Sequence, residues 1–182
     1  MPKSSDLFFA TSNSNKFQEA KQIMDNFGIN LRLFKCELEE IQSNSLKEIA
    51  KSKSLQAFQK CKKPVIVEDD GLFIDSLNGF PGPYSSYVFE TIGNQGILKL
   101  LKQNRDAKFV SIISFYDKKN HETFESKVKG MISKTTVGLG WGYDPIFIPS
   151  KSSKTFAQSK NKVSHRFKAL KKFSNWYLDK LG

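Results

Sequence analysis

The stretch Val65-Ile-Val-Glu-Asp-Asp70 joins three consecutive β-branched apolar residues to three consecutive carboxylates. β-Branched side chains pack well on a pleated surface, so residues 65–67 predict a short buried strand. Strand alternation would send Glu68 and Asp70 to one face and Asp69 to the other. The stretch therefore predicts a buried strand of the fold with a group of acidic side chains at its end.

The residues before this stretch alternate between strand and helix patterns. The expected elements are, in chain order, a strand at 7–10, a helix at 17–27, a strand at 30–34 and a helix at 46–60. The helices are expected from apolar residues at three- and four-residue spacing, and the strands from short apolar or alternating runs. With the strand at 65–67, this succession predicts an α/β layer architecture.

The second half of the chain adds a different pattern. Residues 88–101 favour a helix, and the β-rich segments 109–116 and 122–129 flank a turn-like Asp117-Lys-Lys-Asn120, which predicts a hairpin. Residues 164–181 are expected to form a last helix, with Ser164 as its N-cap. A hairpin added to parallel-type units implies a mixed sheet.

Length and composition favour one globular domain. The chain has 182 residues, 38% of them hydrophobic, which is enough to bury a sizeable core, so we expect a single domain over residues 1–182. It contains no run of about 18 apolar residues, and no membrane-spanning segment is expected. Cys36 and Cys61 form no metal-binding pattern with the two His residues, which predicts reduced thiols in a cytoplasmic protein.

The formal net charge of +11 has two interpretations. A basic surface attracts anionic substrates, but it also suits direct contact with nucleic acid. Lysines are spread along the chain rather than gathered in one arm, so the charge alone does not separate these two interpretations.

Two segments combine hydroxyl, amide and cationic side chains just before a helical pattern: Thr11-Ser-Asn-Ser-Asn-Lys16 and Lys160-Asn-Lys-Val-Ser-His-Arg166. Unpaired backbone N–H groups and the macrodipole make a helix start favourable for anions. Residues 11–16 lack the glycines of a Walker A loop, and a polar helix cap explains them equally well. His165 and Arg166 open a helix, where a cation is slightly unfavourable, so a bound anion or a polar base edge is an attractive explanation.

Two features between these segments suggest a metal and phosphate site. Lys53 falls within the apolar stripe of the helix expected at 46–60, where its charge must either reach water or meet an anion. The carboxylates at 68–70 repel one another unless a cation lies among them, and Mg²⁺ commonly bridges carboxylates to substrate phosphates. An acidic turn with Gly71 as its bend is the alternative. Glu40 and Glu48 are candidate further ligands that spacing does not distinguish.

The glycine-rich segment Gly140-Trp-Gly-Tyr-Asp-Pro145 suggests a platform for a base. Glycine permits close approach of a ligand, and an aromatic face stacks a base for about 1–3 kcal/mol. Trp141 and Tyr143 are equally compatible with a core position. Because the residue before a proline is held extended, we expect the Asp144 carboxylate to point outward. The two candidate anion-binding segments, the carboxylates and the aromatic platform together suggest that the ligand is a nucleoside triphosphate. A Ser-His-Asp hydrolase is the less favoured alternative, because the sequence has no G-x-S-x-G motif.

Seven motifs, in order along nearly the whole chain, resemble those of the inosine/xanthosine triphosphate pyrophosphatase family. They are Thr11-Ser-Asn-x-x-Lys16, Leu38-x-Glu40, Lys53, Val67-Glu-Asp69, Phe80-Pro-Gly-Pro-Tyr84, Gly140-x-Gly-x-Asp-Pro145 and Ser164-His-Arg166. Each is weak alone, but seven in order with compatible gaps make a strong resemblance.

This resemblance implies a Mg²⁺-dependent enzyme that converts a purine nucleoside triphosphate and water into the monophosphate and pyrophosphate. The implied substrates are deaminated purine nucleotides (ITP, dITP and XTP), which would otherwise enter nucleic acids. The implied fold is α/β, with an elongated central mixed β-sheet flanked by helices and two lobes with an intervening substrate cleft. A homodimer without a membrane or stable nucleic-acid partner is also implied.

The resemblance assigns roles by position. Asp69 would help to activate the attacking water, and Glu40 with Asp69 would bind Mg²⁺. The residues assigned to the triphosphate are Thr11, Ser12, Asn13, Ser14, Asn15, Lys16 and Lys53. The residues assigned to the base are Trp141, Gly142, Tyr143, Asp144, Lys160, His165 and Arg166.

Three positions depart from the family pattern. Asp70, a further expected substrate contact, stands where Ser or Thr is frequent and could alter the metal geometry. Ser86 replaces an arginine frequent in bacterial members, which weakens one phosphate contact, and Trp141 stands where Phe is common. The alternatives are a pyrophosphatase of different base specificity and a basic, non-enzymatic nucleic-acid-binding domain, which leaves the acidic residues unexplained.

Overall fold

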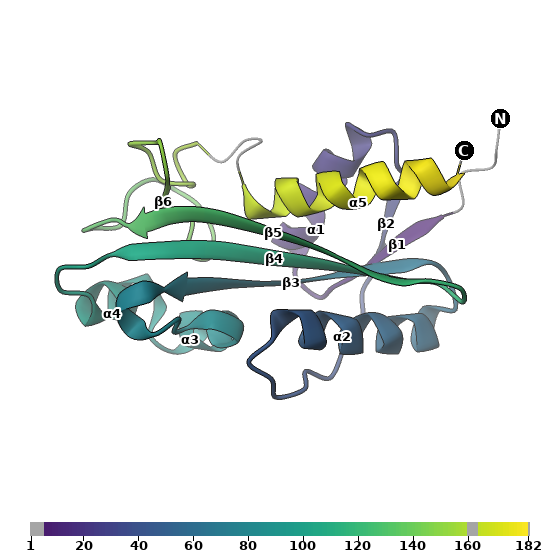
Figure 1. Ribbon diagram of the computed structural model, residues 1–182, viewed down its shortest axis with the longest axis horizontal. Helices are drawn as coiled ribbons and strands as arrows, with labels where there is room; N and C mark the ends of the chain where they lie inside the picture. The colour runs from purple at the N-terminus through teal and green to yellow at the C-terminus, as the bar shows by residue number, and fades with distance from the viewer. Residues whose placement is uncertain (1–5, 160–163, 182) are drawn as a thin grey trace. The chain divides into compact units, whose positions relative to one another are not determined.

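The computed structural model describes residues 6–159 and 164–181 (Figure 1). Six strands form one sheet in the order β2-β1-β3-β4-β5-β6. Their bounds are β1 Leu7–Ala10, β2 Leu31–Phe34, β3 Val65–Ile74, β4 Asp106–Tyr116, β5 His121–Ile132 and β6 Phe147–Pro149. β1 runs parallel to both β2 and β3, with Leu7 opposite Leu31 and Phe8 opposite Val65, whereas β6 runs antiparallel to β5. The sheet is therefore mixed, as predicted.

The helices follow the predicted order, but one expected helix and one expected strand differ from the prediction. Their bounds are α1 Ser14–Asp25, α2 Leu46–Cys61, α3 Ser85–Thr91, α4 Gly93–Leu100 and α5 His165–Leu181, with short 3₁₀ turns η1 Asp75–Leu77 and η2 Gly82–Tyr84. The single helix expected at 88–101 is instead two helices that meet at Gly93, whose φ of +60° is a conformation that glycine adopts readily. The strand expected at 65–67 continues to Ile74, so the acidic residues lie inside β3 and Gly71 is not a bend.

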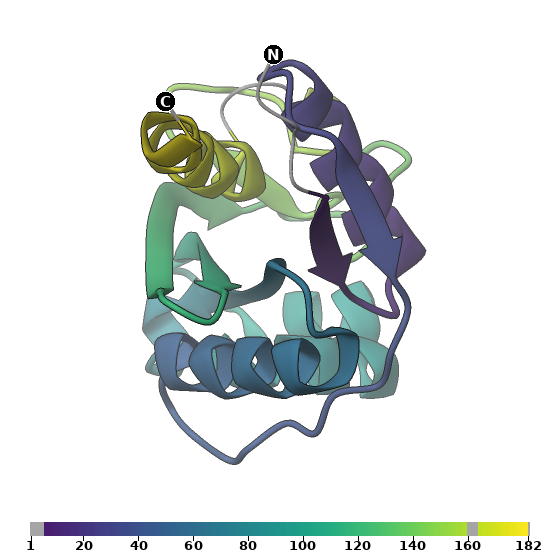
Figure 2. The ribbon, with the colours of Figure 1, turned by 90° about the vertical axis from the view of Figure 1, so that its right-hand side faces the viewer.

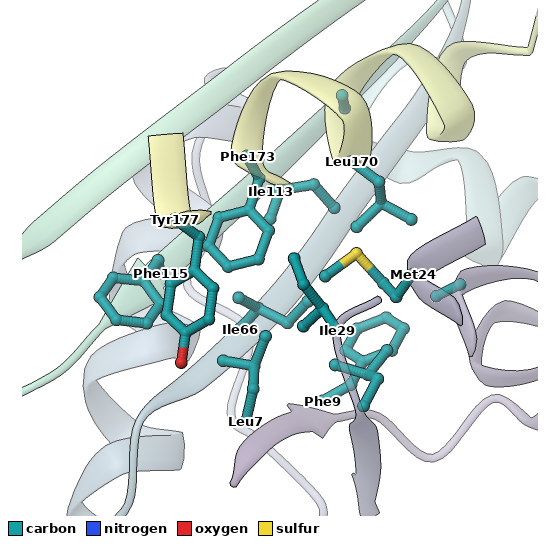
Figure 3. Close-up of a cluster of buried hydrophobic side chains, with 13 residues drawn as sticks. Leu7, Phe9, Met24, Ile29, Ile66, Ile113, Phe115, Leu170, Phe173 and Tyr177 are labelled. Atoms are coloured by element: carbon teal, nitrogen blue, oxygen red, sulfur yellow. The ribbon is translucent and has the colours of Figure 1, made fainter. Parts of the chain in front are cut away.

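The chain divides into two compact units, each with its own core. Unit 1 comprises residues 1–69, 111–125 and 166–182. Within it, α1 and α5 lie on one side of the strands and α2 on the other (Figures 1 and 2). The core between the strands, α1 and α5 contains Leu7, Phe9, Met24, Ile66, Phe115, Leu170, Phe173 and Tyr177 (Figure 3).

Unit 2 comprises residues 70–110 and 126–165. Its core consists largely of aromatic and branched side chains. They come from β3, β4, β5, α3 and α4, from β6 and from the segments that flank β6. Members of this core include Leu72, Ile97, Phe109, Val128, Tyr143, Phe147 and Phe156. The rings of Phe109 and Phe147 meet edge to face with 5.0 Å between centroids, a favourable geometry for aromatic pairs.

Two further expectations can be compared with the fold. Cys36 and Cys61 are free thiols, as predicted. Among the described residues, no helix combines the length and hydropathy that a membrane crossing requires. The single domain over 1–182 and the substrate cleft stay predictions.

Candidate functional site

The alternation predicted for the acidic residues of β3 is confirmed by the partners of their side chains. Glu68 pairs with Arg166 of α5, whereas Asp69 pairs with Lys53 of α2. Because α5 and α2 lie on opposite sides of the unit 1 strands (Figure 1), these two carboxylates point to opposite faces. Asp70 pairs with His165 within unit 2. The neighbouring residues Glu68 and Asp69 thus face different surroundings on the two sides of the strand.

Lys53 joins two carboxylates from different segments of unit 1. Its Nζ lies 3.4 Å from Oδ1 of Asp69 and also contacts Oε2 of Glu40. The side chains of Lys53 and Asp69 are 15% and 11% exposed, whereas that of Glu40 is 50% exposed. The cation in the apolar stripe of α2 therefore meets anions instead of extending into bulk water.

Glu48, the other candidate ligand, has a local role at the start of α2. Oγ of Ser45 accepts a hydrogen bond from the Glu48 backbone N–H at 3.3 Å, and the Glu48 carboxylate accepts one from Ser43 at 2.7 Å. The first contact caps the helix, because it satisfies a backbone N–H that has no partner within the helix, and the second holds the Glu48 carboxylate beside the cap. Of the two candidates, Glu40 is the one that shares Lys53 with Asp69.

Arg166 forms a buried ion-pair network that sequence reasoning missed. Its side chain is fully buried, and its Nε donates to Oε2 of Glu68 at 2.7 Å. Its Nη1 contacts the Glu19 carboxylate of α1, and Ser111 donates to the second oxygen of Glu68 at 2.7 Å. The network ties α5 to α1, β3 and β4. No local pattern indicates it, because Glu19 and Glu68 are far from Arg166 in the sequence.

The segment 11–16 forms the start of α1, directly after β1. Asn13 is the N-cap, and its side chain accepts a hydrogen bond from the Lys16 backbone N–H at 3.1 Å. Thr11 accepts one from the Asn13 backbone N–H at 3.1 Å, while Ser12, Ser14 and Asn15 are exposed. The helix-cap interpretation therefore holds, and phosphate binding by this segment stays a prediction.

His165 and Asp70 form a buried polar contact in unit 2. His165 Nε2 lies 3.5 Å from Oδ2 of Asp70, and the His165 side chain is 2% exposed. The imidazole stacks on Phe109, with ring centroids 4.3 Å apart and planes 5° from parallel. The stacking on Phe109 thus constrains the plane of this imidazole, and the Asp70 carboxylate lies beside its Nε2.

The segment 140–145 divides into a buried part and a more accessible part. Tyr143 is 5% exposed and belongs to the unit 2 core, and its hydroxyl donates to the Ser85 carbonyl at 2.8 Å. Burial raises the pKa of this phenol well above its usual range. The core interpretation thus applies to Tyr143, whereas Trp141 is half-buried. The expectation that Asp144 points outward is wrong, because Asp144 is 6% exposed and lies in a run of turns.

The same segment has an unpredicted partner on α4. The side-chain Nδ2 of Asn94 donates to the Gly142 carbonyl at 3.0 Å. This residue follows Gly93, and in the sequence it is indistinguishable from an ordinary polar residue at a helix start.

The structure thus gathers the predicted residues into separate groups. Lys53, Glu40 and Asp69 are together in unit 1, and Asp70 and His165 are together in unit 2. Lys160 lies outside the described residues.

Comparisons with known proteins agree on one family. A model of the Ham1 family matches residues 7–176. A dITP/XTP pyrophosphatase of Methanopyrus kandleri is 48% identical over 94% of this chain and 95% of its own length, and one of Hyperthermus butylicus is 45% identical over 93% of both chains. A HAM1 protein structure from Coxiella burnetii superposes with a TM-score of 0.83 at 25% identity and covers 96% of this chain and 99% of its own. The chain therefore belongs to the Ham1 family.

Proposed function

We propose that this protein hydrolyses the triphosphates of deaminated purines, namely ITP, dITP and XTP, to the monophosphate and pyrophosphate. Relatives that match nearly the whole chain carry the name dITP/XTP pyrophosphatase. The observation that carries the proposal is the contact of Lys53 with both Glu40 and Asp69. Such a group of charges suits a metal–triphosphate complex.

Glu40 and Asp69 fit a bound Mg²⁺. Oxygens of both carboxylates approach one cationic atom, Nζ of Lys53, and carboxylate oxygens are the ligands that Mg²⁺ prefers. When bound, Mg²⁺ would neutralise phosphate charge and so stabilise the pyrophosphate leaving group. The half-exposed Glu40 and the buried Asp69 would be its protein ligands.

Lys53 and Asp69 would have different roles at the phosphates. The Lys53 ammonium would bind phosphate oxygens and compensate negative charge as pyrophosphate leaves. The Asp69 carboxylate would orient the attacking water and accept its proton during attack on the α-phosphorus. The buried side chain of Asp69, held on a sheet strand, suits this positioning task.

The base would be bound by groups of unit 2. Trp141 is the accessible aromatic residue of the segment 140–145, and His165 offers a ring of fixed orientation. A protein hydrogen-bond donor directed at the 6-oxo group of ITP would meet the 6-amino group of ATP, which is itself a donor. Both groups would then lack a hydrogen-bond acceptor, and this cost disfavours the binding of ATP strongly.

The test is pyrophosphate release at saturating Mg²⁺ from ITP and XTP, compared with GTP, ATP and CTP at equal concentration. We expect fast release from ITP and XTP with the monophosphate as co-product. Release from all five would contradict the base specificity and retain the chemistry. No release, with binding to DNA or RNA that depends steeply on salt, would instead support a nucleic-acid-binding role. The homodimer and the cytoplasmic location stay predictions.

A further inference from the structure

One hydrogen bond links helix α4 to the segment proposed to hold the base. Asn94, the second residue of α4, donates from Nδ2 to the carbonyl of Gly142 at 3.0 Å. The two residues are 48 positions apart in the sequence, and both belong to unit 2. This carbonyl is part of the peptide plane between Gly142 and Tyr143.

Side-chain packing does not hold the backbone at Gly142. Its φ is +60°, and a Cβ added there would meet no atom within 4 Å. A glycine in open space has many accessible conformations, so a tertiary hydrogen bond to its carbonyl restricts the backbone substantially. Trp141 precedes this residue directly, and its carbonyl accepts a hydrogen bond from the Asp144 backbone N–H at 3.3 Å. The bond from Asn94 is therefore a further restraint on the turn that carries Trp141.

The Asn94 carboxamide has one hydrogen bond among the described residues, the bond from Nδ2 to Gly142. Its Oδ1 is buried and has no hydrogen-bond partner among the described residues. The bond from Nδ2 to Gly142 therefore sets the orientation of the whole planar group. Tyr143 is anchored independently by its hydroxyl bond to Ser85, so the loss of Asn94 should loosen the segment at Gly142 and Trp141 without unfolding unit 2.

We propose that Asn94 is a positioning residue for base recognition, which acts by holding the Gly142 carbonyl and thereby the placement of Trp141. The inference rests on the proposed function and deepens it. Asn94 would influence the binding and discrimination of bases, whereas the chemical step, assigned to Asp69, would proceed unchanged once the nucleotide is bound.

Gln95 provides a matched control. It neighbours Asn94 on α4, and its Nε2 donates to Oγ1 of Thr136 at 3.2 Å. That contact is exposed and does not involve the segment 140–145. Asn94→Asp and Gln95→Glu make the same chemical change at adjacent positions, because each replaces an amide donor with a carboxylate of equal size.

The experiment measures steady-state pyrophosphate release from ITP and GTP, together with binding of the α,β-methylene analogue of ITP. Binding is followed by Trp141 fluorescence in a Trp176→Phe background, since these are the two tryptophans of the chain. For Asn94→Asp we expect roughly a tenfold rise in KM for ITP and in Kd for the analogue, the size of one lost hydrogen bond. We expect kcat to change by less than about twofold and the preference for ITP over GTP to fall. Gln95→Glu should match the wild type.

Equal losses for ITP and GTP, a large fall in kcat, or wild-type behaviour of Asn94→Asp would each overturn the inference. Asn94→Ala serves the same comparison if the Asp variant does not fold. A wild-type protein that neither cleaves any nucleotide nor binds the analogue would remove the proposed function, and the inference with it. A wild-type protein that cleaves ITP while Asn94→Asp is indistinguishable from it removes the inference alone.

Discussion

The side chains of the proposed phosphate-binding region in unit 1 and those of the proposed base-binding region in unit 2 are positioned by different kinds of interaction. In unit 1, charged side chains from separate elements pair directly, as Lys53 does with Glu40 and Asp69. In unit 2, neutral hydrogen bonds to backbone carbonyls and aromatic packing position the segment 140–145. Charges suit the binding of a polyanion, whereas neutral contacts of fixed geometry suit discrimination between bases of equal charge.

The largest expected effect concerns the buried ion pair of unit 1. Arg166→Met leaves Glu68 buried without its cation, and Glu19 loses the same partner. We expect the free energy of unfolding to fall by about 3–5 kcal/mol, because an unpaired buried charge is strongly destabilising. Urea unfolding would measure this, with the exposed Lys168→Met on the same helix as the control. A loss below about 1 kcal/mol would mean that the network is not a structural element.

The next effect tests the chemistry assigned to unit 1. Asp69→Asn keeps the size of the side chain but removes its charge and its capacity to accept a proton. We expect kcat for ITP to fall by at least about 100-fold, in line with the loss of a general base. The exposed neighbour of Glu40 offers the control Glu39→Gln, which should be fully active. Near-wild-type turnover by a folded Asp69→Asn protein would remove Asp69 from the mechanism.

Lys53→Ala separates phosphate binding from a purely structural role. Loss of a charged hydrogen-bond donor to phosphate should raise KM for ITP about tenfold or more. Steady-state kinetics measures this, with Lys47→Ala, an exposed lysine in the first turn of α2, as the control. If KM is unchanged while the melting temperature falls, Lys53 serves only to neutralise Glu40 and Asp69.

A smaller effect is expected in unit 2, at the aromatic core. Tyr143→Phe removes the hydroxyl that donates to the Ser85 carbonyl and keeps the packing of the ring. Stability should decrease by about 0.5–1.5 kcal/mol, the usual net value of one hydrogen bond, while KM for ITP stays within about twofold. Urea unfolding and kinetics measure both, and the exposed Tyr87→Phe should change neither. A large loss of activity would show that Tyr143 contacts the nucleotide.

The smallest effect is the pH dependence of a polar group in unit 1. Burial, followed by the charge of Lys51, lowers the pKa of His121 below 6.5, although nearby Glu122 acts in the opposite direction. His121 Nε2 lies 3.0 Å from the buried Ser54 hydroxyl of α2. With a lowered folded-state pKa, the unfolded chain binds the proton more readily. The stability that neutral His121 supplies is therefore complete above about pH 6.5 and is lost as pH falls toward the lowered pKa.

His121→Gln keeps a hydrogen-bonding side chain but cannot titrate. Urea midpoints measured between about pH 5 and 8 should therefore fall less steeply at low pH for the variant than for the wild type. Above about pH 7 the two profiles should run parallel. Identical slopes below pH 6.5 would show that another group controls this range.

Sequence periodicity determined the order of elements, the mixed sheet and the facing of the acidic residues. The opposite directions of Glu68 and Asp69 follow from the two-residue repeat of a strand, which any strand at that position obeys. Lys53 stood out because a cation in an apolar stripe needs a compensating group. Such signals depend only on neighbours along the chain.

Tertiary structure alone decided which side chains meet. Arg166 pairs with Glu68 98 residues away, and Asn94 with Gly142 48 residues away. The strand that was expected to end at residue 67 continues to Ile74. Asp144 is buried although its sequence context predicted an outward direction. Local patterns indicate the face and the chemistry of a residue, but the partner of a buried polar group is selected by packing among distant segments, because only packing excludes water and makes an unpaired group costly.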